Sequence, residues 1–147
     1  MFNVYTDELK RLKAGPFVKK LVNEWNDVRS GTLSPKDRKI YVYTGHDSSI
    51  SNILSALNVW DEQVPTYGIM AMFELYQDKQ TGHFGIEMYL KNTTGRAEPY
   101  PLTIPGCSHF CPLHDLEKLV AHVLPKDMKT ECSPFNQDFT EPPLSGP

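Results

Sequence analysis

A short apolar segment followed directly by an amphipathic helix pattern is the feature that most limits how this chain can fold. The run IYVYT at Ile40–Thr44 has β-branched and aromatic side chains at both odd and even positions, as expected of a strand covered on both faces. After the turn GHD, apolar residues recur at helical spacing, at Ile50, Ile53, Leu54 and Leu57. We therefore expect an α/β fold in which Ile40–Thr44 is an interior strand that leads into a helix.

The remaining patterns predict helices on both sides of this unit and an antiparallel hairpin. Apolar residues at helical spacing predict a helix over about Pro16–Arg29. Alternating residues on either side of a DKQTG turn predict a hairpin over Met70–Leu90. The three prolines of EPYPLTIPG place that segment at a sheet edge or outside the sheet. Beyond Pro112 a third helix is expected, which Pro125 ends.

Length and charge restrict the function classes. The chain has 147 residues and a formal net charge of −3, which fits one domain, predicted at residues 1–133, with a Pro-rich tail at 134–147 predicted to be disordered. Without a basic surface, binding to nucleic acid or to anionic membranes is not expected. The apolar runs are short, far below the ~20 residues of a membrane span. A small molecule or a protein is the expected partner.

The turn between the predicted strand and helix carries the residues best suited to chemistry. In an open α/β sheet, ligands bind beyond the carboxyl ends of the strands, where helix N-termini attract anions. His46 and Asp47 lie there, and an imidazole can contact a phosphoryl oxygen while a carboxylic acid protonates a leaving oxygen. The alternative is that Asp47 or Ser48 is only a helix N-cap and His46 a hydrogen-bonded loop residue. No nucleophile with a base stands beside them in the sequence.

The cysteines and an Asn-x-Thr sequence point to an oxidising compartment. The sequence has three cysteines and a glycosylation acceptor at Asn92, which we expect on the exposed end of a hairpin strand. The spacing of Cys107 and Cys111 favours a local disulfide. A zinc site built from these two cysteines with His114 and Cys132 is the alternative. The first residues contain no apolar signal-peptide core, so we expect the chain to be the C-terminal part of a longer secreted protein.

Several segments together resemble one family. They are YTGHDSSISNILSALNV, FELYQDKQTGHFGIEMYLKN, EPYPLTIPGCSHFCPL and LPKDMKTEC. Over about Arg11 to Ser133 they resemble the C-terminal portion of the histidine acid phosphatases, which include prostatic, lysosomal and insect venom acid phosphatases. The resemblance implies part of a mainly parallel, helix-flanked sheet of the phosphoglycerate mutase-like fold, extended by the antiparallel hairpin.

For the mechanism, the resemblance implies hydrolysis of a small-molecule phosphomonoester through a phosphohistidine, without a cofactor. His46 would contact the phosphate and Asp47 would protonate the leaving alcohol. The family's nucleophile lies in an Arg-His-Gly motif, and this sequence has none. Its five histidines are His46, His83, His109, His114 and His122, of which we expect the last four to be solvated or packing residues. This chain alone is therefore expected to be inactive.

Further expectations concern the protein from which the chain would derive. The resemblance implies a Cys107–Cys111 disulfide and pairs Cys132 with a cysteine of the missing N-terminal part. It places the full-length protein in a secreted or lysosomal location. The acceptor sequence itself leads us to expect glycosylation at Asn92, and a homodimer of the full-length protein is a further expectation. The alternative to an acid phosphatase is a truncated, non-catalytic secreted protein or interaction module.

Overall fold

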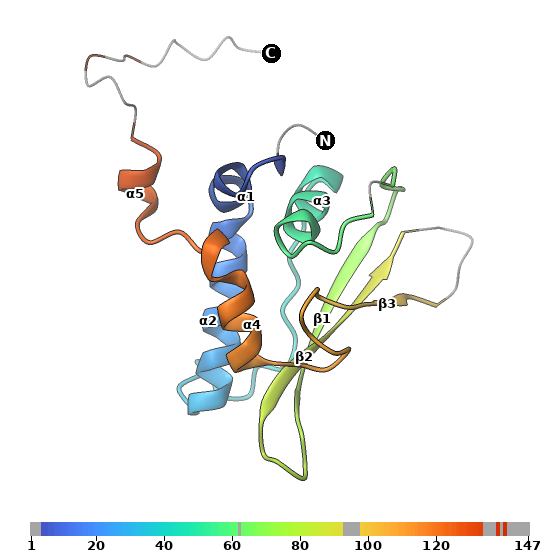
Figure 1. The fold of residues 1–147 in the computed structure, drawn as a ribbon. Coiled ribbons are helices and arrows are strands. Elements are labelled where there is room, and N and C mark those ends of the chain that lie inside the picture. Colours follow the sequence, from blue (N-terminus) through green and yellow to red (C-terminus); the bar gives the residue numbers. More distant parts are fainter. Residues whose placement is uncertain (1–3, 62, 93–97, 134–137, 139, 141–147) are drawn as a thin grey trace.

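Helices form one layer of the chain and a small sheet forms the other. The computed structural model describes residues 4–61, 63–92 and 98–133 together with residues 138 and 140. The tail expected at 134–147 thus lies, apart from residues 138 and 140, outside the described part. In Figure 1 the helices stand on one side of the sheet. They are α1 (Asp7–Lys13), α2 (Gly15–Ser30), α3 (Asp47–Ala56), α4 (Leu113–Val120), the 3₁₀ turn η2 (Ala121–Val123) and α5 (Met128–Glu131).

The helix predictions for α2, α3 and α4 are confirmed. Pro16 stands in the first turn of α2, and Gly31 closes this helix with a left-handed φ of 72°, which glycine adopts without strain. The helical segment of α4 and η2 ends at Val123, two residues before Pro125. Helix α1 was not expected. Its N-cap Thr6 accepts a hydrogen bond from the Leu9 amide at 3.2 Å.

The sheet is antiparallel throughout the described residues. Strand β1 (Met70–Gln77) pairs with β2 (Phe84–Lys91) in a register that sets Phe73 opposite Met88, which confirms the hairpin. Strand β3 (Tyr100–Leu102) lies at the edge beside β2, as the prolines around it predicted. The two residues of β4 (Cys111–Pro112) also pair with β2.

The core lies between the helices and the inner face of the sheet. Leu54 of α3 and Leu90 of β2 are fully buried, and Leu116 of α4 is 1% exposed. Trp25 of α2 meets Phe73 of β1 with ring centroids 6.0 Å apart. Burial of apolar surface on this scale is the main force that holds α3 in place. Among the described residues, no helix is long and apolar enough to span a bilayer.

The predicted interior strand at Ile40–Thr44 is wrong for this chain. The segment is not part of the sheet, and Ile40 and Val42 are 77% and 81% exposed. On its other face Tyr43 packs edge-on against Phe17 of α2, with ring centroids 5.0 Å apart, and its hydroxyl donates to Glu24 at 2.8 Å. A strand needs a hydrogen-bonded neighbour, and all the strand pairs described involve β1 to β4. The fold is α/β in class, but no parallel pairing is present in the described part.

Candidate active site

The segment 40–45 leads into α3 (Figure 1). His46 and Asp47 stand at this junction. His46 is the N-cap residue, with an extended backbone (φ −85°, ψ 160°), and Asp47 is the first residue of the helix. The His46 carbonyl accepts the Ser49 amide at 3.0 Å. A Cβ on Gly45 would come within 3.3 Å of the Ser49 hydroxyl oxygen, so glycine allows the close turn that brings both residues to the helix start.

The helix that carries these residues is firmly docked. The hydroxyl of Ser51, which is fully buried, donates to the Ser48 carbonyl at 3.1 Å within the first turn. One turn later, Leu54 is fully buried in the core. A buried hydroxyl with a partner adds little cost and fixes the turn. The candidate half-site of His46 and Asp47 therefore stands at the start of a helix that is anchored in the core, although both side chains are exposed.

The cap alternative is wrong in its assignment of residues. The Asp47 carboxylate accepts its neighbour's amide, that of Ser48, at 2.6 Å, but the N-cap itself is His46, whose side chain makes no capping bond. Asp47 is the acidic residue in the first turn of the helix, where its charge interacts favourably with the helix dipole. Both side chains remain accessible to a ligand, so a contact to a phosphoryl oxygen and a proton transfer fit this geometry.

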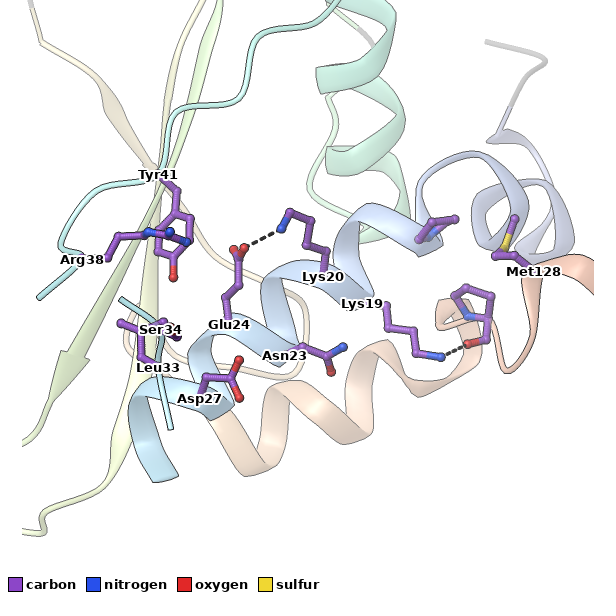
Figure 2. A pocket seen from close by; sticks show the side chains of 12 residues that line it. Lys19, Lys20, Asn23, Glu24, Asp27, Leu33, Ser34, Arg38, Tyr41 and Met128 are labelled. Carbon is purple, nitrogen blue, oxygen red and sulfur yellow. Dashed lines mark hydrogen bonds and ion pairs between the residues drawn. The ribbon is translucent and has the colours of Figure 1, made fainter. Parts of the chain in front are cut away.

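A polar hollow of about 530 Å³ lies along α2 and is also lined by Tyr41 of the segment 40–45 (Figure 2). The three cationic side chains that line it all contact neighbouring groups: the guanidinium of Arg38 lies over the Tyr41 ring, 5.1 Å from its centroid. Lys19 donates to the Pro125 carbonyl at 2.7 Å, and Lys20 pairs with Glu24 at 2.7 Å. The residues that line the hollow include neither His46 nor Asp47. The hollow is thus separate from the half-site.

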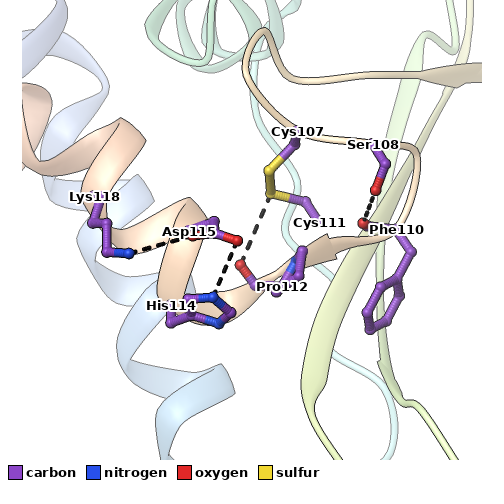
Figure 3. The surroundings of a disulfide bond; sticks show 8 residues. All are labelled: Cys107, Ser108, Phe110, Cys111, Pro112, His114, Asp115 and Lys118. Carbon is purple, nitrogen blue, oxygen red and sulfur yellow. Dashed lines mark hydrogen bonds and ion pairs between the residues drawn. A yellow bond between two sulfur atoms is a disulfide. The ribbon is translucent and has the colours of Figure 1, made fainter. Parts of the chain in front are cut away.

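The disulfide expected between Cys107 and Cys111 is confirmed (Figure 3). Their Cα atoms are 5.3 Å apart, and Gly106 takes a left-handed φ of 92° just before the bridge. Because a disulfide consumes both thiols, the alternative zinc site that would use them is wrong. Among the described residues, no group of three or more His, Cys, Asp or Glu side chains suits a metal ion. Cys132 is an exposed free cysteine, and its pairing with an upstream cysteine stays a prediction.

Asn92 differs from its expected surroundings. It is 8% exposed instead of lying at an open strand end, because the segment 63–66 covers it. Its side-chain oxygen accepts the Thr66 amide at 2.9 Å, and its nitrogen donates to Gln63 at 2.5 Å. The alternation of apolar and polar residues in the hairpin predicted an exposed strand end, but it cannot show that a distant segment covers that end. Thr93 and Thr94, the rest of the acceptor sequence, lie outside the described residues, and glycosylation of Asn92 stays a prediction.

The other four histidines make contacts with residues outside the half-site. His109 lies 3.1 Å from the Tyr89 hydroxyl, which donates to Glu87 at 2.7 Å. That hydrogen bond to a carboxylate raises the pKa of Tyr89 to about 12. The His83 and His114 rings are 6.0 Å apart, and His122 lies 3.9 Å from Asp7. The alternating pattern of β2 places Glu87 and Tyr89 on one face, but His109 comes from a distant loop.

Comparison with known proteins establishes the family. The profile of the histidine phosphatase superfamily, branch 2, matches residues 1–91. The chain belongs to this superfamily. Rat prostatic acid phosphatase is 41% identical over 125 residues, which cover 85% of this chain and 31% of the relative. Bovine lysosomal acid phosphatase is 38% identical over 133 residues, or 90% of this chain and 30% of the relative.

This histidine phosphatase chain spans about a third of the length of the curated relatives it matches. Human prostatic acid phosphatase, at 38% identity, is likewise covered over only 32% of its length. The match runs through the segment 40–45 and α3, so the residues that position His46 and Asp47 lie inside the recognised domain.

Proposed function

We propose that this chain is the C-terminal part of an acid phosphatase that hydrolyses small phosphomonoesters through a phosphohistidine. The observation that carries the proposal is the pair His46 and Asp47, exposed at the N-terminus of the docked helix α3. Family membership and the prostatic and lysosomal relatives support it. A secreted or lysosomal location of the full-length protein is part of the proposal, and the disulfide is consistent with it.

The half-covered segment 40–44 indicates how the site would be completed. One face of the segment packs on α2, while Ile40 and Val42 are exposed on the other. We infer that strands from polypeptide preceding this sequence pair with it and cover the open face. The carboxyl end of the segment leads to His46, so a histidine nucleophile at the end of a neighbouring strand would face the half-site.

The proposed reaction has two steps. In the first, the nucleophilic imidazole nitrogen forms a bond to phosphorus while the ester P–O bond breaks, and Asp47 transfers its proton to the departing alkoxide. In the second, a water oxygen bonds to phosphorus, the N–P bond breaks, and Asp47 accepts the proton of the water. His46 would donate a hydrogen bond to the phosphoryl oxygens, on which charge gathers in both steps.

The test is the dependence on the leaving group in the natural-length protein. Asp47→Asn should slow histidine phosphorylation by an alkyl phosphate by about 10²- to 10⁴-fold, and by nitrophenyl phosphate far less, because nitrophenolate leaves without a proton. His46→Ala should slow both substrates. Asp61→Asn, the same change at an exposed position after α3, is the matched control. Equal slowing of the two substrates by Asp47→Asn in single-turnover experiments would contradict the assignment.

A second candidate function is a non-catalytic secreted protein or interaction module. It is favoured by one observation, that the 147 residues contain no Arg-His-Gly motif. The two candidates predict different masses for the protein isolated from its natural source. An intact mass well above 16.7 kDa, with the additional polypeptide containing that motif, supports the enzyme. A homodimer of the full-length protein is a further proposal, and its mass in solution tests it.

A further inference from the structure

Tyr43 attaches the segment 40–45 to α2 through a charged group. Its hydroxyl donates to both carboxylate oxygens of Glu24, each at 2.8 Å. The ammonium of Lys20, one turn earlier in α2, lies 2.7 Å from the same carboxylate, and a dashed line joins the two in Figure 2. This ammonium also lies 5.5 Å from the centroid of the Tyr43 ring. Each of the three side chains thus contacts the other two.

The hydrogen bond between Tyr43 and Glu24 is of a strong kind. The side chain of Glu24 is only 15% exposed, and hydrogen bonds to an ionised acceptor are stronger than those between neutral groups. Partial burial, and then the hydrogen bond to Glu24, raise the pKa of Tyr43 above its ordinary value of 10.0. The hydroxyl is therefore protonated and able to donate throughout the physiological pH range.

This hydrogen bond is the polar attachment of the segment. Among the described residues, no backbone hydrogen bond joins 40–45 to a helix or a strand. The hydroxyl of Tyr41, two residues earlier, is buried without a hydrogen-bond partner in the part of the chain that the structure describes. Without the Tyr43 hydroxyl, the segment would keep only ring contacts, such as that of Tyr43 with Phe17 of α2.

The two residues of the half-site differ in how they are held. Asp47 belongs to α3, and its carboxylate accepts the Ser48 amide at 2.6 Å. His46 precedes the helix in an extended backbone, and its side chain makes no capping bond. Only residues 44 and 45 separate His46 from Tyr43. The position of His46 therefore depends on α3 and on Tyr43, whereas that of Asp47 depends on α3.

We propose that Tyr43 is a positioning residue, which through its hydrogen bond to Glu24 sets where the His46 imidazole stands relative to the phosphoryl group. This inference rests on the proposed function of the half-site. Tyr43 would act through the backbone of residues 44–46 and not by touching the substrate. Displacing a group by about 1 Å can slow a reaction by about 10²-fold. Loss of the Tyr43 hydroxyl should displace His46 and leave Asp47 in place.

Single-turnover histidine phosphorylation in the natural-length protein, at saturating alkyl or nitrophenyl phosphate, tests the inference. Tyr43→Phe keeps the ring and removes the hydroxyl. Tyr41→Phe is the matched control, because it removes a hydroxyl without a partner from the same segment. We expect Tyr43→Phe to slow both substrates by about tenfold and Tyr41→Phe to leave both rates unchanged. Equal slowing by the two variants would contradict the inference.

Double-mutant cycles separate positioning of His46 from a general structural effect. In the His46→Ala background, Tyr43→Phe should slow phosphorylation by less than about twofold, because the side chain that it positions is gone. In the Asp47→Asn background, Tyr43→Phe should still slow it by about tenfold. The same slowing in both backgrounds, or no slowing in the parent, would overturn the inference. The leaving-group dependence of Asp47→Asn would in that case still support the proposed function.

Two variants of Glu24 replace Tyr43→Phe if that variant does not fold. Glu24→Gln keeps a side-chain oxygen that can accept from Tyr43, whereas Glu24→Ala keeps none. The alanine variant should therefore slow both substrates more than the glutamine variant does, and equal rates would overturn the inference. Loss of the leaving-group dependence in Asp47→Asn would instead overturn the proposed function, and the inference with it.

Discussion

At the scale of single residues, Asp78 shows how the hairpin turn depends on a charge. Its carboxylate accepts the backbone amides of Thr81 and Gln80 at 2.7 and 2.8 Å. These hydrogen bonds, the one from Thr81 first, hold the pKa of Asp78 below its ordinary value of 3.8. A carboxyl whose pKa falls on folding stabilises the native state above its unfolded pKa. That contribution disappears as the pH falls through the lowered value.

Asp78→Asn should therefore make the free energy of unfolding depend less on pH in the acid range. The amide oxygen keeps an acceptor for the turn but cannot be protonated in this range, so the variant should be less stable than the parent at neutral pH. The gap should narrow below about pH 4. Thermal unfolding midpoints between pH 2 and 7 measure it, with Lys79→Gln in the same turn as a control for charge. A gap that does not change with pH would contradict the argument.

At Gly15, at the start of α2, we expect substitution by alanine to change stability in the direction opposite to that given by helix propensity. Alanine is about 1 kcal/mol better than glycine inside a helix. Here, however, a Cβ would lie 2.2 Å from the Val123 carbonyl oxygen. Because that atom is backbone, Gly15→Ala should destabilise the protein by about 1–3 kcal/mol. Asn23→Ala, an exposed position of the same helix, should be neutral or stabilising, and chemical denaturation of both variants provides the comparison.

At the scale of elements, local patterns predicted what depends on local contacts. Helices α2 and α3 and the hairpin follow from apolar periodicity, and their buried residues lie on the faces that the periodicity indicates. Helix α1 was missed because none of its residues is buried, which leaves periodicity without a signal. Its Thr6 cap, its acidic first turn and its basic last turn are the pattern that would have found it.

The same limit explains the errors at the strand and at Asn92. The apolar residues of 40–44 predicted a strand buried on both faces, but a strand also requires a hydrogen-bonded neighbour, and which segment supplies it is a property of distant sequence. Asn92 is buried by residues 63–66, about thirty positions earlier in the chain. The positions of His46 and Asp47 at a helix start were predictable, since they depend only on the adjoining turn.

The disulfide loop between β3 and α4 should behave as a small, independent stabilising element. Cys107 and Cys111 enclose a short loop with a sequence separation of 4, and the entropy of closing a loop of that size corresponds to about 2 kcal/mol. Replacing both cysteines by serine should lower the free energy of unfolding by about that amount. Non-reducing peptide mapping should find this bridge. Cys132 should be free or paired between two molecules in the isolated chain, and joined to an upstream cysteine in the natural protein. A Cys107–Cys132 bridge would contradict the assignment.

At the scale of the whole molecule, the open face of residues 40–44 determines what this chain does by itself. Exposed apolar side chains on an extended, unpaired segment promote pairing between copies. The 147 residues, produced alone, should therefore self-associate with rising concentration and show no turnover of an aryl phosphate. Sedimentation and a phosphatase assay measure the two properties. Turnover that His46→Ala abolishes would show that the half-site needs no further polypeptide.

The half-covered segment 40–44 also has a consequence for the timing of synthesis. In the longer protein proposed above, the ribosome would deliver this central strand only after the strands that flank it. Those strands would wait with open edges for the time that translation takes, at about 5–20 residues per second. During that interval they would be suitable clients for chaperones. Hydrolytic activity would begin only when the last third of the longer protein has left the ribosome, so the growing polypeptide would be inactive until then.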